Sequence, residues 1–498
     1  MVKHRIASQI LLLPLLLLGC GEVAFNLAED AGTSFSEQVR GEALLFVGTD
    51  PSSLATDLYL VTAASSSVDS PSLTTAESYE LEQLTDTENP DEALELGSYQ
   101  LFSLEQPHPI PDRSGDRFAL ITQSVDEQSG NSINHPAVYD LTTRSLQQGP
   151  AIQGLHSIHF SDQGASLALS ARSEEGGETL LMLPADELDA TPVLLQLEAD
   201  ESNYSYEFAG PIPASDDILA LRINEDEAKS QVLRVDSLSG EAEVLSGALE
   251  GLLDQASLSA DGQLLAVTVH HPENNYRAVA VIDKYAQIHT ITENLSSNCY
   301  WPVWAPIHEK LGQRLSFVCQ DAISGRPDIG MWSAEVLKGL DDEVGDAAAL
   351  DYAADLLTTV SQPAIFEGTM DGLVVRSSPQ WSPNGNSLVF GVSTHEEALA
   401  GTGMSLLVLP LSGTAYPIYS GSGTSVDWAH FSQASDDQSL LLWERSATGL
   451  ESTRRGPESQ PIRMLTIDQP EPQPIFVRLD QDLLVSYPMF LGGNSLFY

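Results

Sequence analysis

The stretch Pro379–Phe390, P-Q-W-S-P-N-G-N-S-L-V-F, reads as two short β-strands joined by a tight turn. Trp381 is a large apolar residue at the end of the first strand. Pro383, Asn384 and Gly385 are turn residues, because Pro fixes φ, Asn bonds its own backbone and Gly accepts positive φ. β-forming residues follow the turn. The stretch therefore predicts a β-hairpin.

The same frame occurs eight times along the chain. The other copies are Pro109–Leu120, Ile158–Leu169, Pro211–Leu221 (one residue shorter), Ala256–Val267, Pro302–Phe317 (four extra turn residues), Phe431–Leu442 (two extra) and Pro488–Tyr498. Their turn positions, 115, 164, 217, 262, 312, 385, 437 and 493, are separated by 49, 53, 45, 50, 73, 52 and 56 residues. A period near fifty, built from short strands, is typical of a β-propeller or another repeat array. A lone hairpin cannot bury both faces, so neighbouring copies must stack.

This frame resembles the WD40-like repeat of the TolB family, P-x-W-S-P-D-G-x-x-I-A-F, over about residues 43–498. The resemblance implies that each copy supplies the two inner strands of a propeller blade. Only Ala260-Asp261-Gly262 keeps the Asp-Gly pair, and Trp recurs only at 304 and 381. We predict an all-β fold over residues 42–498. It is a β-propeller of four-stranded antiparallel sheets with eight blades, or seven if one weak copy fails.

Two further segments complete this prediction. Strands are expected at 42–47 and 57–61, and we expect them to supply the outer half of the last blade, which removes open sheet edges. Residues 335–372 form an insertion between the fifth and sixth copies, with helical propensity near 347–357. Long loops are often functional, although an insertion without a role fits equally well.

The charge balance is strongly acidic. Asp and Glu number 71 against 22 Lys and Arg, for a net charge of −49. Such a surface repels phosphate backbones, so we expect no nucleic-acid partner. The excess fits a well-solvated surface, and it also fits a surface that attracts cations or a basic partner.

The beginning of the chain has the pattern of an export signal. Lys3, His4 and Arg5 precede the largely apolar run 6–18, which is short for a membrane span and matches a signal-peptide core. The run ends Leu17-Leu18-Gly19-Cys20, which resembles the bacterial lipobox. The resemblance implies a signal peptide at 1–19, lipidation of Cys20 and a flexible acidic tether at 20–41. Gly21 after the cysteine implies the outer membrane, facing the periplasm.

The other two cysteines, Cys299 and Cys319, flank the fifth hairpin. An even pair in an exported protein favours a disulfide, and we predict one within that blade, although the strand register is not secured by the sequence. No C-x-x-C motif is present, so a cysteine zinc site is not expected.

Motifs for catalysis are missing from the sequence. The nucleophile elbow G-x-S-x-G does not occur, which argues against a peptidase of the α/β-hydrolase type. Neither His395-Glu396 nor His308-Glu309 continues to H-E-x-x-H, and 341–346 lacks EF-hand spacing. We therefore predict no catalytic residue, no metal ligand and no cofactor. Ca²⁺ would belong only to an enzyme alternative.

Residues just before each frame are candidates for the mouth of a propeller channel. Aromatic and charged side chains there suit contacts with a protein or ligand, although large aromatics also pack between blades. The candidates are His156, Tyr204, Tyr206, Tyr300, Trp301, Arg376, Asp427, Trp428 and Tyr487.

Together these features predict a lipid-anchored cell-envelope protein. Its propeller would act as a scaffold that binds another envelope protein or a peptidoglycan-associated component, with the membrane reached through the lipid anchor alone. The alternative is a propeller enzyme of the lactonase or glycan hydrolase type with a central cation.

Overall fold

A computed structural model describes residues 43–49, 56–63, 79–86, 100–101, 109–125, 132–172, 177–195, 204–246, 249–262, 264–273, 275–283, 288–292, 297–306, 314–321, 327–333, 355–356, 373–382, 384–394, 396, 405–410, 416–419, 424–431, 439–446, 462–466, 469–474, 484–490 and 494–495. The chain divides into two units, Met1–Thr33 and Ser34–Tyr498, and every described residue belongs to the second. The predicted signal peptide, Cys20 and the tether lie outside the described residues. Within the described part, no helix is long and apolar enough to cross a membrane.

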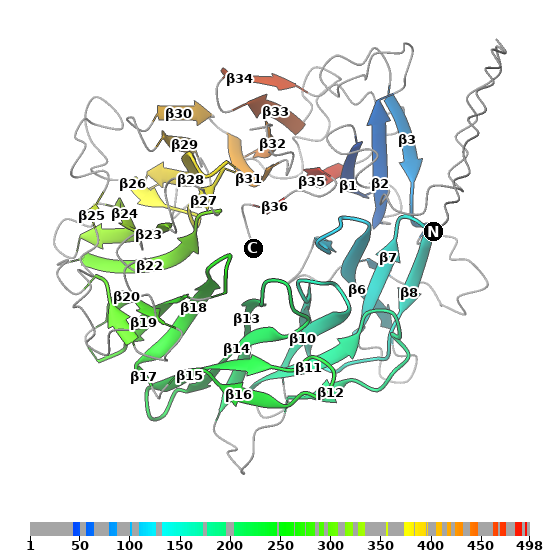
Figure 1. The fold of residues 1–498 in the computed structure, drawn as a ribbon. Helices are drawn as coiled ribbons and strands as arrows, with labels where there is room; N and C mark the ends of the chain where they lie inside the picture. Colours follow the sequence, from blue (N-terminus) through cyan, green and yellow to red (C-terminus); the bar gives the residue numbers. More distant parts are fainter. Residues whose placement is uncertain are drawn as a thin grey trace, which may run out of the picture. The chain divides into compact units, whose positions relative to one another are not determined.

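The described elements are all strands, and they form eight antiparallel sheets (Figure 1). Sheet 1 contains β4 (Gln100–Leu101), β5 (Ile110–Pro111), β6 (Arg117–Val125), β7 (Ser132–Asp140) and β8 (Ser145–Gln148). Sheet 2 contains β9 (Leu155–Phe160), β10 (Ser166–Arg172), β11 (Glu178–Pro184) and β12 (Val193–Leu194). Sheet 3 contains β13 (Ser205–Pro211), β14 (Ile218–Asn224), β15 (Lys229–Val235), β16 (Ala242–Val244) and β17 (Leu249–Glu250). Sheet 4 contains β18 (Leu252–Leu258), β19 (Leu265–His271), β20 (Tyr276–Ile282) and β21 (Ile288–Thr290).

The remaining four sheets follow the same order. Sheet 5 contains β22 (Ser297–Trp304), β23 (Arg314–Asp321), β24 (Pro327–Ser333) and β25 (Asp355–Leu356). Sheet 6 contains β26 (Leu373–Val375), β27 (Gln380–Trp381), β28 (Ser387–Thr394), β29 (Ser405–Pro410) and β30 (Tyr416–Tyr419). Sheet 7 contains β31 (Thr424–Phe431), β32 (Ser439–Ser446), β33 (Ile462–Thr466), β34 (Gln469–Pro474) and β36 (Asn494–Ser495). Sheet 8 contains β35 (Leu484–Phe490), β1 (Ala43–Thr49), β2 (Thr56–Ala63) and β3 (Tyr79–Gln83).

Seven of the eight frames form the predicted inner hairpin, and four of these use the expected glycine. Gly115, Gly164, Gly262 and Gly385 have φ of 75°, 76°, 69° and 66°. The N–H of each glycine donates to the carbonyl three residues earlier, at 2.8 to 3.0 Å. Only glycine adopts this conformation at no steric cost. The positive φ at this turn position therefore explains why the repeat has a glycine there.

The third frame differs from its sequence-based prediction. Pro211 pairs with Ile218 just as Phe160 pairs with Leu167, so the separation is seven residues in both (218 − 211 and 167 − 160). The frame is therefore not one residue shorter, and its turn position is 215, not 217. Positive φ moves to Ala214 (57°), directly after a proline, which is the pattern of a type II turn.

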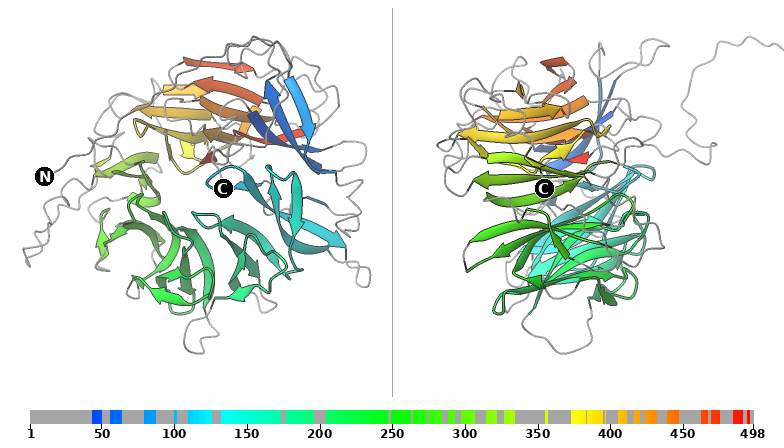
Figure 2. Two further views of the ribbon diagram at one scale, coloured as in Figure 1. Left: turned by 45° about the vertical axis from the view of Figure 1, so that its right-hand side comes forward. Right: turned by 60° about the vertical axis from the view of Figure 1, so that its left-hand side comes forward.

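The second strand of each well-described hairpin is buried on both faces. On β14, Ile218 and Ala220 pack against sheet 2, whereas Leu219 and Leu221 pack against sheet 4. Alternate residues of a strand point to opposite faces, so one short apolar run contributes to two cores. The same alternation stacks each consecutive pair from sheet 8 with sheet 1 to sheet 5 with sheet 6 (Figure 2).

Tryptophan contacts recur at the junctions between sheets. The Trp304 indole N–H donates to the Ser257 carbonyl at 2.8 Å, and that of Trp381 donates to the Val303 carbonyl at 3.1 Å. The two acceptors occupy equivalent positions on the preceding inner strands. Trp381, the apolar anchor of the opening stretch, is therefore a contact between blades.

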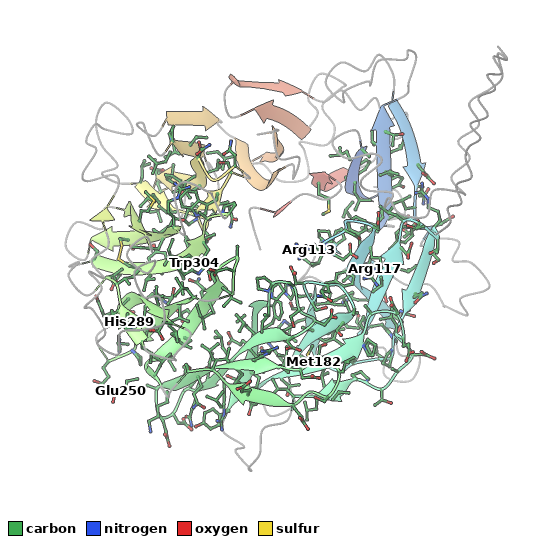
Figure 3. All side chains as sticks on the ribbon, in the orientation of Figure 1. Arg113, Arg117, Met182, Glu250, His289 and Trp304 are labelled. Carbon is green, nitrogen blue, oxygen red and sulfur yellow. A yellow bond between two sulfur atoms is a disulfide. The ribbon has the colours of Figure 1, made fainter. Side chains whose placement is uncertain are left out.

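Arginine contacts recur in the same way. Arg117 and Arg314 each donate an Nη2 hydrogen bond of 2.6 Å to the turn carbonyl of the next sheet, at Gly164 and Gly385. The two guanidinium groups lie over Phe160 and Trp381, at 5.4 and 5.0 Å from the ring centroids. Figure 3 shows Arg117 and Trp304 on their strands.

The two ends of the described chain meet in sheet 8. Strand β35 pairs with β1, with Leu45 opposite Met489. The N-terminal strands therefore complete the last sheet as expected, but they supply three strands, not two. The frame 488–498 forms no hairpin, because β1 carries fully buried apolar residues and takes the place beside β35. Consecutive sheets that pack and close in this order define a β-propeller, the fold class that the sequence predicts.

The helix expected near 347–357 is not present at 355–356, the two of these positions that the structure describes. Asp355 and Leu356 form β25, which pairs with Met331 and Gly330 of β24. The free edge of β24 offers backbone partners that outweigh the local helical propensity. The rest of the insertion lies outside the described residues.

Cys299 and Cys319 lie directly opposite each other on β22 and β23 and form a disulfide, with Cα atoms 4.1 Å apart. This is the pairing that the sequence analysis expects. Both cysteines are fully buried in the core between sheets 4 and 5. The bond therefore ties together the two inner strands of sheet 5.

Candidate functional site

In sheets 2, 3, 4, 5 and 7, the inner strand brings one recurring position to the same end of the sheet. It lies four residues before the last paired residue of each inner strand, which is Phe160, Pro211, Leu258, Trp304 or Phe431. We call the residues at this position the mouth residues; they are His156, Glu207, Asp254, Tyr300 and Asp427.

Most mouth residues lie at or beside a β-bulge. The pairing of β9 with β10 skips His156, that of β18 with β19 skips Asp254, and that of β31 with β32 skips Asp427. In β22 the register shifts directly after Tyr300. A bulge leaves its extra residue unpaired and redirects its side chain, and bulges are over-represented beside functional sites.

His156 is held by a hydrogen-bond network within sheet 2. Its Nε2 lies 2.7 Å from Glu178 Oε2, and Arg172 Nε donates to Glu178 Oε1 at 3.0 Å. Glu178 stands at the start of β11, so the network bridges the inner and outer strands of the sheet. The imidazole is thereby oriented near the start of β9.

Glu207 is a carboxyl group whose pKa is shifted by its surroundings. Burial by the surrounding protein raises its pKa, although the side chain itself reaches solvent. The negative charges of Glu178, Asp254 and Glu225 raise the pKa further, while His156 opposes them. The mouth residues of sheets 2, 3 and 4 are therefore close enough to interact electrostatically.

Asp254 is paired within sheet 4 with an arginine whose charge also acts on sheet 5. It accepts a hydrogen bond of 2.9 Å from Arg277 Nε, on β20. The charge of Arg277 also acts on Tyr300, whose pKa is raised mainly by burial and lowered by that charge. Four successive mouth residues, from His156 to Tyr300, thus form one electrostatic series.

Trp301 has an unusual backbone. Its φ is 57°, a value that is a genuine outlier for a bulky side chain. The Trp301 N–H donates to Gln255 Oε1 in sheet 4 at 2.9 Å, which holds this conformation from the neighbouring sheet. Strained backbone of this kind clusters at functional sites.

The other candidates from the sequence have mixed outcomes. Tyr206, Tyr300 and Trp301 are partly buried and pack against the cores between sheets, so part of each side chain has a structural role. The Arg222 guanidinium lies 3.8 Å from the centroid of the Tyr204 ring. Arg376 is exposed after β26. Trp428 and Tyr487 lie on β31 and β35, respectively.

Sequence reasoning missed Glu207, Asp254 and Glu178. The sequence candidates are mostly aromatic and pass over Glu207 and Asp254. Counting eight residues back from the turn residue Gly262 finds Asp254, whereas the same count finds Glu207 only from the turn position 215 that the structure gives. Glu178 has no such signal, because it comes from the third strand of its sheet.

Neither clustered metal ligands nor the open recess in the described residues offers a further site. The described residues contain no group of three or more His, Cys, Asp or Glu that could hold a metal ion. An open recess of about 590 Å³ lies at the turns of sheets 1 and 2, lined in part by Arg113, Asp116 and Asp162. Arg113 Nη1 donates to Asp162 Oδ2 at 2.6 Å across it, so the recess is part of the junction between the sheets.

No family model and no curated protein matches the sequence. Among solved structures, TolB from Acinetobacter baumannii is 15% identical with a TM-score of 0.32; the match covers 76% of this chain and 65% of that one. An oligogalacturonate lyase in complex with manganese is 14% identical with a TM-score of 0.46, covering 81% and 94%. The β-propeller domain of the Trilobed protease from Pyrococcus furiosus is 11% identical with a TM-score of 0.42, covering 75% and 97%.

By its sheet topology the chain is a β-propeller protein. TolB and a β-propeller domain are among the solved structures that resemble it, and these likenesses concern the fold alone. The chain spans about 65% of the length of the TolB that it matches.

Proposed function

We propose that this chain is a binding scaffold of the cell envelope, which holds a protein partner at the mouth residues. The observation that carries the proposal is the recurrence of β-bulges at one position of β9, β18 and β31. Regular strands would satisfy the fold, so a repeated interruption at one end of the inner strands indicates a site. Rigid sheets with irregular segments at one end are suited to recognition.

The mouth residues define the chemistry of the partner. Glu207 and Asp254 are exposed carboxylates on neighbouring sheets, and the chain carries a net charge of −49. A partner with Lys or Arg side chains would gain from complementary charge, mainly through faster association and exclusion of anionic competitors. Half-buried Tyr300 and Trp301 add apolar contact area beside the charges.

The location belongs to the same proposal. Export through the signal peptide 1–19 and lipidation of Cys20 would tether the propeller to the outer membrane, facing the periplasm. The acidic tether 20–41 would let the mouth residues reach a partner. An envelope protein is the partner we favour, and a peptidoglycan-associated component is the alternative partner.

Cross-linking of the intact protein in its native membranes tests this proposal. We expect one recurrent protein partner, which is lost with Glu207→Lys/Asp254→Lys because these substitutions reverse the charge at the mouth. The matched control is Glu241→Lys/Glu243→Lys, two exposed glutamates at the outer strand of sheet 3, which should leave capture unchanged.

Two further outcomes separate the parts of the proposal. Cys20→Ser should release the protein from membranes, and retention in the membrane fraction would contradict the lipid anchor. Equal capture by the mouth variant and its control would contradict the role of the mouth residues. A melting temperature that rises with Ca²⁺ would instead support the enzyme alternative.

A further inference from the structure

The inner edges of the sheets are rows of backbone N–H and C=O groups. Within the described residues, β9, β13, β18 and β22 are the terminal strands of their sheets. An unpaired edge is a template for another strand. Sheet 7 differs, because a fifth strand, β36, pairs with the inner edge of β31.

Strand β36 comes from a distant part of the sequence. It pairs antiparallel with β31, with Phe431 opposite Asn494 and His430 opposite Ser495. It follows β35 of sheet 8 after only three residues, which include Gly492 and Gly493. Figure 1 shows β36 on the side of β31 that faces the middle of the group of sheets. The chain therefore leaves one sheet and adds to the inner edge of the preceding one.

The pairing is short for the edge that it occupies. The Asp427 bulge interrupts β31, so the regular edge beyond the bulge runs from 428 to 431, and β36 pairs with the last two of these residues. Two residues make few ladder hydrogen bonds, and ordering them costs conformational entropy. A pairing of this length is weak enough to be displaced by a better strand.

We infer that the inner edge of β31 is a strand-addition site, which β36 fills within the chain and an extended segment of a protein partner fills in its place. Main-chain hydrogen bonds supply the affinity in this mode of recognition. The site adjoins the mouth residue Asp427, so the same partner can pair with β31 and contact the mouth. The inference rests on the proposed binding function and specifies how the partner would be held.

A peptide added in trans tests the site without any partner. The probe is a fluorescein-labelled peptide with the sequence of residues 491–498, and a scrambled peptide is its control. In Asn494→Pro/Ser495→Pro, β36 loses the N–H groups that a strand needs. We expect this variant to bind the peptide at least about tenfold more tightly than the unchanged chain, where β36 competes at high effective concentration.

Hydrogen exchange gives an independent readout. Amides at 428–431 should exchange faster in the proline variant and slow again when the peptide is added. Equal peptide affinity for both proteins, or no effect of the peptide on these amides, would overturn the inference. If the variant fails to fold, a protease site placed between Gly493 and Asn494 and cleaved after folding gives the same comparison.

The outcomes also separate this inference from the proposed function. If the membrane cross-linking captures a partner but the peptide binds neither protein, the binding scaffold stands and strand addition is wrong. If the peptide binds only the variant and no partner is captured, the edge accepts strands and the proposed binding function is wrong.

Discussion

At the scale of residues, the junctions between sheets depend on a few side chains with several partners each. Arg117 donates to Asp112 within its own turn and to Asp186 and the Gly164 carbonyl in sheet 2. Arg113, in the same turn, has one ion pair and a side chain that is 67% exposed. Two arginines in one turn, Arg113 and Arg117, are therefore expected to contribute differently to stability.

Arg117→Ala should lower the free energy of unfolding by about 2–3 kcal/mol, because it leaves the nearly buried Asp112 carboxylate without its cation. The control Arg113→Ala should cost less than about 1 kcal/mol, as is usual for an exposed pair. Urea denaturation of both variants checks this. Equal costs would show that the contacts of Arg117 do not hold the junction.

Glu207 gives a prediction about pH. The folded state raises the pKa of the Glu207 carboxyl group, so ionisation of this group destabilises the fold. Its contribution to stability is therefore fully present below the pKa that Glu207 has in the unfolded chain. It is lost as the pH rises through the higher pKa of the folded state. Glu207→Gln should therefore raise the melting temperature at about pH 8 and leave it nearly unchanged at about pH 3. Glu243→Gln, on the outer strand of the same sheet, is the control. The same pH-independent shift in both variants would contradict this account of the mouth.

At the scale of elements, the hairpins could be predicted from the sequence because turn chemistry and strand composition agree. The repeat locates the pair of inner strands in seven of the eight frames, and a turn glycine sets the register in four of them. The third frame differs from its prediction because Ser215 occupies the glycine position and Pro213-Ala214 makes a different turn. The bulges were not predicted, because no residue type marks them and only pairing with the second strand reveals them.

The disulfide is the element-scale feature with the clearest energetic consequence. Cys299 and Cys319 are 20 residues apart in sequence. By the chain-entropy estimate, closing such a loop stabilises the fold by about 3 kcal/mol. Cys299→Ala/Cys319→Ala should therefore lower the denaturation midpoint, and a reducing agent should not lower it further. If reductant shifts the midpoint of the double variant as much as that of the unchanged chain, the stabilisation does not come from this bond.

At the scale of the whole molecule, the fold depends on the meeting of distant segments. Met489 of β35 is fully buried in the core that joins sheets 8 and 1, with residues of β1, β2, β6 and β7. The sequence predicted that the N-terminal strands complete the last sheet. It could not predict that the N-terminal segment supplies three strands of sheet 8 and the C-terminal segment only β35. That division depends on which strand buries more apolar surface beside β35.

Met489→Ala should lower the free energy of unfolding by about 2–4 kcal/mol, since it leaves a cavity in the closing core. Leu238→Ala is the control, because Leu238 is 72% exposed, and it should change stability by less than about 0.5 kcal/mol. Thermal and chemical denaturation of both variants give the comparison. A small effect of Met489→Ala would indicate that the two ends do not close the propeller.

The central claim is that a protein partner binds at the mouth residues. The most direct measurement places a photo-cross-linking amino acid at Asp254 in one protein and at Leu238 in another, and irradiates each in native membranes. We predict one cross-linked partner from position 254 and none from position 238. The same products from both positions, or no product from position 254 while the protein is folded, would contradict the claim.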